Sequence, residues 1–300
     1  MTRQFTFLVN PASGGGAAPE AVVPVARLLR DAGAGVEVTY SPGPHATRDL
    51  LSRAIDRGDV VVSVGGDGML SSLAGAVSHA DGTLAVVPAG RGNDFARMLG
   101  FPDDPAGQAR VLLSGEGRVD LLSWSGGGVS RLVAGSVYAG VDARASEIVD
   151  RAHWLPKSLQ YPYAAVRALA TYRPGRYRLS VDGVEREYAA ATVVVANSAY
   201  YGKGMRIAPA ATVDDGLLDV VVIEAASRVG LMRALPTVFD GAHVSRDEVT
   251  VLTGKRVELC GRSRTPIPVG ADGEPLGMLP GLDDEPAIVE IQPGALSMVC

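Results

Sequence analysis

Residues 59–77 read DVVVSVGGDGMLSSLAGAV, and this stretch decides the fold. A run of β-branched residues enters a glycine turn, and the chain leaves the turn in small residues typical of a helix. Apolar runs of this kind are typical of strands buried on both faces of a parallel sheet. Glycines between such a strand and a helix can cradle a phosphate. Asp67 lies among these glycines, however, and its carboxylate would repel a bare phosphate.

The residues around this stretch alternate in the same way from the N-terminus to residue 120. Strands are expected at 5–10, 35–40, 60–64 and 83–88, and helices at 19–33 and 45–58. The first helix begins at a proline and stops at a glycine, as helices commonly do. Such alternation predicts a mostly parallel sheet with right-handed crossovers.

After residue 120 the pattern changes to short alternating strands. The segment SVDGVERE at 180–187 is a hairpin signal, and helical stretches are expected only at 143–172 and 228–240. We therefore predict two domains with a boundary near residue 122. The first, 1–122, is a three-layer α/β nucleotide-binding domain, and the second, 123–292, is an all-β sandwich. The tail 293–300 either ends the β region or returns to the first domain.

The composition limits the classes of partner. Of the 300 residues, 47% are hydrophobic and 20% are charged, and the net charge of −5 argues against a nucleic-acid partner. The two cysteines, Cys260 and Cys300, have no metal-ligand spacing. The chain contains no apolar run of about 18 residues, so we expect a cytoplasmic protein without a membrane span.

Residues 151–180 stand out by charge. They contain six basic residues, no acidic residue, one tryptophan and four tyrosines. In an acidic protein this segment is a candidate surface for anionic membrane lipid. The alternative, which we weigh equally, is a solvated helix whose aromatic residues pack on the sheet.

Three glycine-rich loops follow strands of the first domain: NPASGGG, GGDG and PAGRGND. All should lie at the carboxyl edge of the parallel sheet, where open α/β folds bind ligands. One such loop alone is better explained as a tight turn, whereas three at one edge favour a polyphosphate. The chain contains no P-loop motif, and GGDGML does not match the dinucleotide fingerprint. An acid among the glycines makes sense if Mg²⁺ bridges it to phosphates or if it hydrogen-bonds an acceptor hydroxyl.

The motifs NPASGGG, GGDG, PAGRGNDFAR, DDGLLDV and ADGEP together resemble the diacylglycerol kinase/sphingosine kinase superfamily, and most of all its soluble bacterial diacylglycerol kinases. The resemblance covers nearly the whole chain. It implies an ATP-binding α/β domain like that of NAD kinases, a β-sandwich domain, and a final segment that returns to the first domain. It also implies transfer of the γ-phosphoryl group of MgATP to a lipid hydroxyl, with diacylglycerol as the leading acceptor and phosphatidic acid as the product of this step in phospholipid biosynthesis.

The resemblance also implies site residues. The nucleotide would contact the three loops and the residue after the second strand: Asn10, Ser13, Gly14, Gly15, Gly16, Tyr40, Gly65, Gly66, Asp67, Gly68, Met69, Gly90, Arg91, Asn93 and Asp94. Asp67 would also be catalytic, and Asp272 or Glu274 of ADGEP would accept the proton of the lipid hydroxyl. The side chain of Asp215 and the backbone carbonyls of Thr212 and Leu217 would hold a structural Mg²⁺. Without the other motifs, ADGEP reads as a β-turn and DDG as a turn before a strand.

The chain departs from the family pattern at a few nucleotide contacts. Met69 replaces a threonine, Ser71 and Ser72 replace an amide and a carboxylate, and Arg91 replaces a second threonine. Arg91 could itself clamp a phosphate through its guanidinium fork. The nucleotide preference and the catalytic rate are therefore left open.

Several alternatives remain at this point. The acceptor could be a sphingoid base or another lipid alcohol, the enzyme could act on a soluble dinucleotide as NAD kinases do, or the protein could be a non-catalytic nucleotide- or lipid-binding regulator. DDGLLDV and ADGEP favour the lipid branch. We expect peripheral contact with the membrane that holds the substrate, and the sequence leaves a homodimer open.

Overall fold

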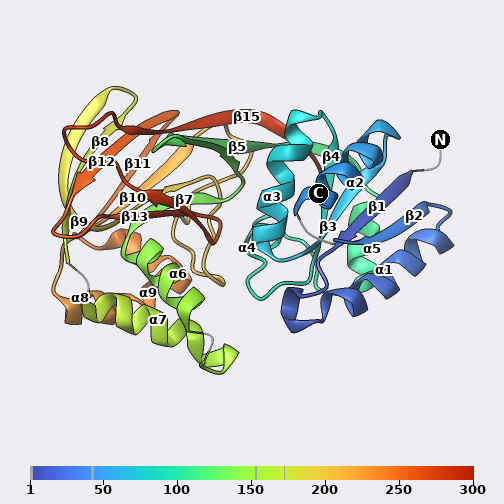
Figure 1. Ribbon diagram of the computed structural model, residues 1–300, viewed down its shortest axis with the longest axis horizontal. Helices are drawn as coiled ribbons and strands as arrows, with labels where there is room; N and C mark the ends of the chain where they lie inside the picture. The colour runs from blue at the N-terminus through green and yellow to red at the C-terminus, as the bar shows by residue number, and fades with distance from the viewer. Residues whose placement is uncertain (1–2, 42–43, 153, 172) are drawn as a thin grey trace. The chain divides into compact units, whose positions relative to one another are not determined.

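The computed structural model describes residues 3–41, 44–152, 154–171 and 173–300. Two residues of the helical stretch expected at 143–172, His153 and Tyr172, lie outside the described residues. Contacts within the chain divide it into two compact units. Unit 1 comprises residues 1–121, 202–204 and 293–300, and unit 2 comprises residues 122–201 and 205–292. Figure 1 labels the elements of both units.

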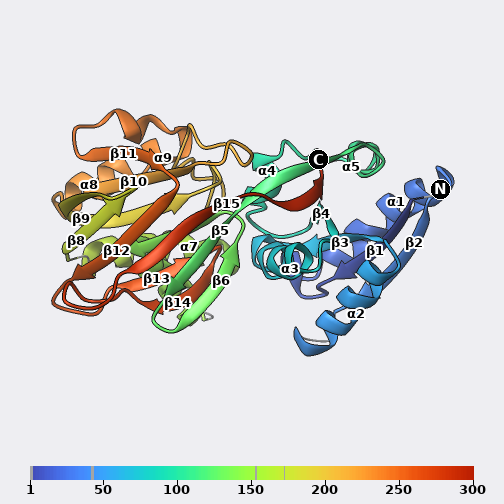
Figure 2. The ribbon, with the colours of Figure 1, turned by 90° about the horizontal axis from the view of Figure 1, so that it is seen from above.

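Unit 1 is a parallel sheet between two layers of helices, as the sequence predicts. The sheet order is β15-β4-β3-β1-β2, and all of these pairs are parallel. The elements of unit 1 are β1 (Gln4–Val9), η1 (Ser13–Gly15), α1 (Ala18–Asp31), β2 (Gly35–Tyr40), α2 (Pro44–Asp56), β3 (Val60–Gly65), α3 (Asp67–His79), β4 (Thr83–Pro88), α4 (Asp94–Met98) and α5 (Pro105–Leu112). Figure 2 shows α1 and α5 on one face of the sheet and α2 and α3 on the other.

Alternating side chains of the central strands build the two halves of this core. Phe5, Phe7 and Val9 of β1 pack with Val25 and Leu29 of α1 on one face. Every residue of β3 is buried, because helices cover both faces of the sheet. This explains why the β3 sequence is continuously apolar rather than alternating.

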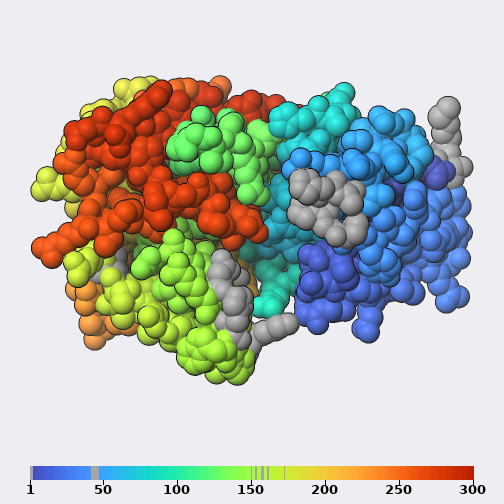
Figure 3. Space-filling view, viewed as in Figure 1, coloured from blue at the N-terminus to red at the C-terminus, as the bar shows by residue number. Residues whose placement is uncertain are grey.

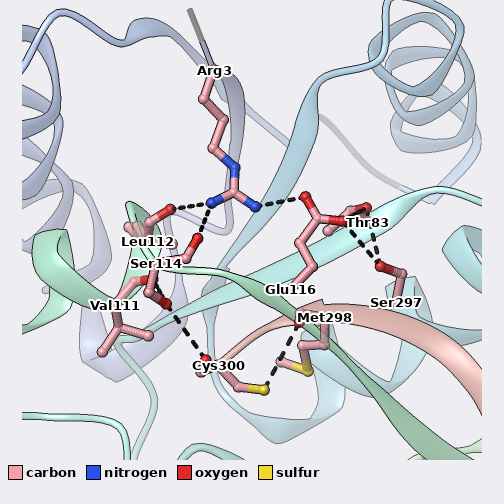
Figure 4. A network of polar contacts seen from close by, with 9 residues as sticks. All are labelled: Arg3, Thr83, Val111, Leu112, Ser114, Glu116, Ser297, Met298 and Cys300. Carbon is pink, nitrogen blue, oxygen red and sulfur yellow. Dashed lines mark hydrogen bonds and ion pairs between the residues drawn. The ribbon is translucent and has the colours of Figure 1, made fainter.

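The last residues of the chain complete the sheet of unit 1. Ser297 and Met298 of β15 (Ala287–Val299) pair in parallel with Thr83 and Leu84. Figure 4 shows the polar contacts at this end of the strand. Glu116 accepts hydrogen bonds from Arg3, Thr83 and Ser297, so one carboxylate joins three segments that lie far apart in the sequence.

In its described residues, unit 2 is built from antiparallel strands, the helices α6 to α9 and the 3-10 helix η2. The order β14-β13-β7-β9-β8-β12-β15 is extended by β10 and β11, which add to β9, and by β5 and β6. Its elements are β5 (Glu116–Gly126, entering from unit 1), β6 (Val129–Val133), β7 (Ser136–Gly140), α6 (Val141–Arg151), α7 (Lys157–Thr171), β8 (Gly175–Val181), β9 (Val184–Ala196), β10 (Leu218–Glu224), α8 (Arg228–Ala234), α9 (Thr237–Asp240), η2 (Ala242–Ser245), β11 (Val249–Gly254), β12 (Arg256–Arg262), β13 (Pro268–Ala271) and β14 (Glu274–Met278).

Both faces of β9 are buried from Ala190 to Ala196. Val193 and Val195 point into the strand-built core, whereas Val194 and Ala196 pack toward Ile207 and the helical side. The all-β expectation for this region therefore holds for its core. Its helices, which the sequence places at 143–172 and 228–240, cover one side.

Candidate functional site

The three glycine loops predicted from the sequence meet at the carboxyl edge of the unit 1 sheet. A Cβ atom added to Gly90 would lie 2.3 Å from the Cα of Gly66, and one added to Gly14 would lie 2.5 Å from the carbonyl oxygen of Ala89. Real Cβ atoms do not approach other atoms this closely, so glycine is required at both positions. The loops after β1, β3 and β4 therefore form one surface rich in backbone N–H groups.

The first loop turns with the help of left-handed glycines. Gly14, Gly15 and Gly16 have φ values of 62°, 81° and 103°, which only glycine adopts readily. The side chain of Asn10 accepts a hydrogen bond from the backbone N–H of Ala12 at 3.0 Å. This contact and the backbone hydrogen bonds from Ser13 N–H to the Asn10 carbonyl and from Gly16 N–H to the Ser13 carbonyl hold the loop.

The third loop is held by Asn93. This residue has a left-handed backbone at φ 53° and lies just before α4. Its side-chain oxygen accepts a hydrogen bond from Gly90 N–H at 2.9 Å, and its amide donates to the Gly90 carbonyl at 3.3 Å. Asn93 therefore closes the turn internally, and the exposed side chain of Arg91 stands at its outer side.

Asp67 occupies the first turn of α3 and also caps a second helix. Its carboxylate accepts a hydrogen bond from the backbone N–H of Phe95 in α4, at 3.1 Å. Its other oxygen lies 2.8 Å from a Cβ built on Gly92. Positive helix ends favour a carboxylate at this place. Asp67 thus joins the second loop to the third, whatever further role it has.

Asp94 connects the third loop to a segment that sequence reasoning did not find. The Asp94 carboxylate accepts hydrogen bonds from the backbone N–H groups of Lys203 (2.8 Å) and Gly204 (2.7 Å), and from the guanidinium of Arg97 (2.6 Å). Residues 202–204 therefore belong to unit 1 although the sequence around them belongs to unit 2. The only signal in the sequence is the glycine-flanked YGKG at 201–204.

Lys203 adds a second cation to this part of unit 1. Its backbone is left-handed, at φ 71°, a conformation that non-glycine residues adopt rarely. Burial and then the charge of Arg91 lower the pKa of Lys203, and Asp94 opposes this shift. Two positive side chains, Arg91 and Lys203, thus influence each other beside the glycine loops.

The remaining predicted nucleotide contacts take different positions. Tyr40 ends β2 opposite Val9 and is half exposed, at the same sheet edge as the loops. Met69 lies over Gly65, with its sulfur 3.0 Å from a Cβ built there. The hydroxyl oxygen of Ser13 lies 3.1 Å from the same built Cβ. All of these residues belong to unit 1, and the structure brings the predicted loop residues to one edge of its sheet. Their contacts with a nucleotide stay predictions.

The ADGEP turn of unit 2 separates its two acids clearly. The Asp272 carboxylate accepts hydrogen bonds from the backbone N–H groups of Ala134, Gly135 and Ser136, at 2.9–3.2 Å. The hydroxyl of Tyr138 accepts a further hydrogen bond from Gly273 N–H at 3.0 Å. Burial raises the pKa of Tyr138 to about 12, so this hydroxyl stays protonated. Asp272 therefore anchors the turn to the start of β7.

Glu274 differs from Asp272 in every one of these respects. Its side chain is exposed at the first position of β14, and among the described contacts it has no hydrogen bond or ion pair. A carboxylate with unoccupied lone pairs can take up a proton without breaking a contact. Of the two acids, Glu274 is the one that the turn presents outward.

The predicted metal ligands lie in the turn before β10. Asp215 accepts a hydrogen bond from the Leu217 N–H at 2.9 Å, and Thr212 is exposed nearby in the chain. Asp219, which the sequence did not single out, is buried. Its burial, with the charge of Asp215, raises the pKa of Asp219 to about 6. Among the described residues no three His, Cys, Asp or Glu side chains cluster as a metal site, so carbonyl ligands would have to complete this one.

Unit 2 also contains a partly open, mostly apolar cavity of about 80 Å³, which sequence reasoning missed. It lies between β9, β10 and the helices, and its apolar lining includes Leu169, Ala191, Ile223, Leu231 and Leu235. Polar side chains also line its wall: Asp142, Thr192, Tyr201, His243, Arg246 and Glu248. Thr192 donates a hydrogen bond to Asp142 at 2.7 Å. Burial raises the pKa of Asp142, and the hydrogen bonds from Thr192 and Tyr201 oppose that shift.

Comparison with known proteins assigns both units. Residues 4–124 match the diacylglycerol kinase catalytic domain, and residues 135–300 match the YegS C-terminal NAD kinase beta sandwich-like domain. A diacylglycerol kinase of Mycobacterium tuberculosis is 34% identical over 259 residues, covering 85% of this chain and 84% of that protein. The chain belongs to the diacylglycerol kinase family.

Other members share the same extent and fold. A diacylglycerol kinase of Bacillus subtilis is 24% identical over 283 residues, covering 92% of this chain and 91% of that protein. The crystal structure of a diacylglycerol kinase from Bacillus anthracis str. Sterne covers 99% of this chain and 96% of that one, with a TM-score of 0.69 at 18% identity. The resemblance and the fold class predicted from the motifs are thereby confirmed.

Family membership makes the protein a lipid kinase that uses ATP. Phosphoryl transfer depends mainly on positioning and on neutralising phosphate charge. A surface of backbone N–H groups at the ends of three strands, with cationic side chains beside it, suits that task. Among the described residues of this kinase, no helix combines the length and apolarity that a bilayer span requires.

Proposed function

We propose that this kinase transfers the γ-phosphoryl group of MgATP to the free hydroxyl of diacylglycerol and so forms phosphatidic acid. The relatives from Mycobacterium tuberculosis and Bacillus subtilis are named diacylglycerol kinases, which favours this acceptor. The observation that carries the choice of a lipid over a soluble dinucleotide is the apolar cavity of unit 2. Its wall is mostly apolar, with polar side chains from Asp142, Thr192, Tyr201, His243, Arg246 and Glu248, as suits a ligand with hydrocarbon next to a hydroxyl.

The chemistry assigned to the residues is simple. The lipid hydroxyl oxygen forms a bond to the γ-phosphorus, the bond between that phosphorus and the bridging oxygen breaks, and ADP leaves. The hydroxyl proton passes to a carboxylate, and the exposed Glu274 is the better supported acceptor of the two acids in its turn. Asp272 then acts as a positioning residue through the three N–H groups it binds.

The phosphates would be held by unit 1. The N–H groups of the loops at Gly14 and Gly66 and the side chain of Arg91 would surround them, and Asp67 would stand at the N-terminus of α3. Mg²⁺ supplies charge neutralisation of the triphosphate when it is bound. We assign Asp67 to binding either the ion or the acceptor hydroxyl, and its position in the first turn of α3 beside the third loop supports this.

The turn before β10 fits a second, structural Mg²⁺ by its donor chemistry. Burial and then the charge of Asp215 raise the pKa of Asp219, and a hard cation bound at this turn would favour both carboxylates in their ionised form. Asp219 therefore joins Asp215, Thr212 and Leu217 in the proposed set. Titrating the protein with MgCl₂ should raise its Tm, and Asp215→Asn should remove that response.

A side-by-side acceptor assay tests the proposal. The purified protein is incubated with γ-labelled ATP and MgCl₂, with detergent micelles of diacylglycerol, of sphingosine or of a monoacylglycerol, or with NAD in solution. We expect label in phosphatidic acid, and less than a tenth as much in the other products. Label transferred mainly to NAD would overturn the lipid assignment. ATP binding without any labelled product would favour a non-catalytic regulator.

A cavity-filling variant ties the acceptor to unit 2. Ala234 of α8 lines the cavity, and Ala234→Leu adds three carbons there while keeping a good helix former. The KM for diacylglycerol should rise several-fold while the KM for ATP stays unchanged. The control is Ala80→Leu, at an exposed position just after α3.

A further inference from the structure

The outer face of α7 is apolar although it faces solvent. Leu159 and Val166 are 52% and 55% exposed, and Pro162 is exposed between them. These positions follow the i, i+3, i+7 spacing of one helix face. The opposite face of α7 buries Ala164 and Ala168 against the rest of unit 2. The helix therefore has two apolar faces, and only one of them is covered.

Aromatic and cationic side chains border this face. The indole of Trp154 is 71% exposed, and its ring centroid lies 5.7 Å from that of Tyr163 in an edge-on contact. The guanidinium of Arg167 stacks over the same tyrosine at 5.8 Å and donates a hydrogen bond to its hydroxyl. The exposed Trp154 and Arg167 thus form one cluster with the half-buried Tyr163. Figure 3 shows α6 and α7, in yellow-green, at the molecular surface.

The outer face of α8 repeats this pattern. Val229 and Met232 are 52% and 38% exposed at i, i+3 spacing, and the exposed Arg233 follows them. On the inner side, Leu231 of α8 packs with Leu169 of α7 in one buried cluster. The two helices are therefore neighbours, as Figure 1 also shows, and their outer faces belong to one surface.

The two segments that build this surface carry basic side chains and no acidic ones, and Asp240 follows directly after the second. Residues 151–180 and 225–239 contain no aspartate or glutamate, in a chain whose net charge is −5. Phe239, which is 54% exposed, ends the second segment. Two segments distant in sequence thus combine exposed apolar side chains with arginines and exclude acids. A solvated helix face gives no reason for that shared composition.

We propose that the outer faces of α7 and α8, with Trp154 and Phe239, form a docking surface for an anionic lipid bilayer. Exposed apolar side chains, a tryptophan and a basic border are the features of helices that lie in the membrane interface. Arginines gain attraction from the negative surface potential. The inner sides of the same helices line the apolar cavity, through Leu169 of α7 and Leu231 of α8. A diacylglycerol molecule would then pass between two helices to reach the cavity, and this last step rests on the proposed function.

The two tryptophans of the chain make docking measurable. Trp124 is 1% exposed and Trp154 is 71% exposed, so changes in emission on adding vesicles report on Trp154. With phosphatidylcholine vesicles that contain phosphatidylglycerol, the emission should shift to shorter wavelength, and brominated acyl chains should quench it. Phosphatidylcholine vesicles alone should bind at least tenfold more weakly. Added salt should release the protein, because screening weakens the electrostatic part.

Paired variants separate the apolar part from the charged part. Val229→Ser with Met232→Ser should weaken vesicle binding about tenfold or more, because both side chains lose their transfer into the interface. Val184→Ser is the matched control, since Val184 is 59% exposed on the β8–β9 hairpin of the same unit. The control should bind vesicles like the wild type.

Charge reversal follows the same design. Arg167→Glu with Arg233→Glu should abolish the preference for phosphatidylglycerol, whereas Arg264→Glu, at an exposed site on a loop of unit 2, should preserve it. Equal binding to both vesicle types by the wild type, or unchanged binding by both double variants, would overturn the proposal. Dimerisation that these variants abolish, without vesicle binding, would instead assign the surface to a second copy of the chain.

The test does not depend on the proposed acceptor. Vesicle binding is measured without nucleotide, and kinase activity is measured on diacylglycerol in detergent micelles. If the wild type showed no activity on diacylglycerol in micelles but bound vesicles, only the proposed function would be refuted. Full micellar activity with no vesicle binding would refute the docking surface alone.

Discussion

Replacing Asp272 with asparagine should destabilise the protein, and replacing Glu274 with glutamine should not. Asp272 has a left-handed backbone at φ 47°, which asparagine adopts as readily as aspartate. The substitution therefore leaves the backbone unstrained and removes only the negative charge and one acceptor oxygen. Both carboxylate oxygens of Asp272 are engaged by N–H donors.

The size of the effect follows from those donors. An amide keeps one acceptor oxygen, so the N–H of Ala134 or that of Ser136 loses its partner, and both residues are almost completely buried. An unsatisfied buried donor costs about 1–3 kcal/mol, and the remaining bonds lose about 1 kcal/mol because they are no longer charge-assisted. The free energy of unfolding should therefore fall by about 2–4 kcal/mol. For a unit of this size the Tm should fall by roughly 5–12 °C.

Glu274→Gln is the matched change. It alters the same charge two residues away, on a side chain that is exposed and without a described contact. Surface changes of this kind stay within about 0.5 kcal/mol, so the Tm should not move measurably. If Glu274 accepts the proton, kcat should fall by about 10²–10⁴-fold while both KM values hold. Asp272→Asn should also lower activity, because the turn that positions Glu274 would lose hydrogen bonds.

Urea unfolding and micellar kinase assays on both variants decide the matter. Wild-type stability of Asp272→Asn would show that its three hydrogen bonds do not hold the turn, and the reasoning would fail. Full activity of Glu274→Gln with an inactive but stable Asp272→Asn would move the proton acceptor to Asp272. Low temperature keeps the weaker variant folded during the assay.

Three further outcomes test other parts of the structure. Gly90→Ala should raise the KM for ATP at least tenfold by separating two loops, whereas Gly115→Ala, whose added Cβ meets no atom within 4 Å, should leave it unchanged. Arg91→Ala should raise the KM for ATP and leave the KM for diacylglycerol unchanged in steady-state assays. Burial lowers the pKa of His243, so its contribution to stability is complete above the unfolded pKa of about 6.5 and declines as the pH falls below it. Urea titrations between pH 7 and pH 5 should show that decline, and His243→Gln should remove it.

The parallel sheet and its loops could be predicted because local sequence determines them. The run VVVSV has only one stable surrounding, a sheet covered on both faces, and the glycines after it permit close approach of backbone. Chain order alone then brings the ends of β1, β3 and β4 to one edge. The contact of Gly66 with Gly90 is a consequence of that topology.

Other features depend on contacts between residues far apart in the chain. Asp94 was predicted from its motif, but its partners Lys203 and Gly204 lie more than 100 residues away and are backbone groups, which carry no residue signature. The cavity is also invisible in sequence, because the apolar residues at its wall resemble those of any core. Asp272 and Glu274 were inseparable for the same reason, since the three N–H donors that distinguish them come from residues 134–136.

The departures from the family pattern in the second and third loops have different structural consequences. After GGDG, Met69 covers Gly65, and Ser72 donates a hydrogen bond to the Met69 carbonyl. The side chains of these two replacements therefore make contacts within α3 and the loop before it. Arg91 differs, because its side chain is exposed and its charge lowers the pKa of Lys203. The substitutions in α3 therefore remove polar groups from one loop, while the change in the next loop adds a cation to the same edge. A triphosphate held there would lose hydrogen-bond donors and acceptors near α3 and gain charge near α4, which predicts an ATP affinity more sensitive to salt than that of a relative with threonine in place of Arg91.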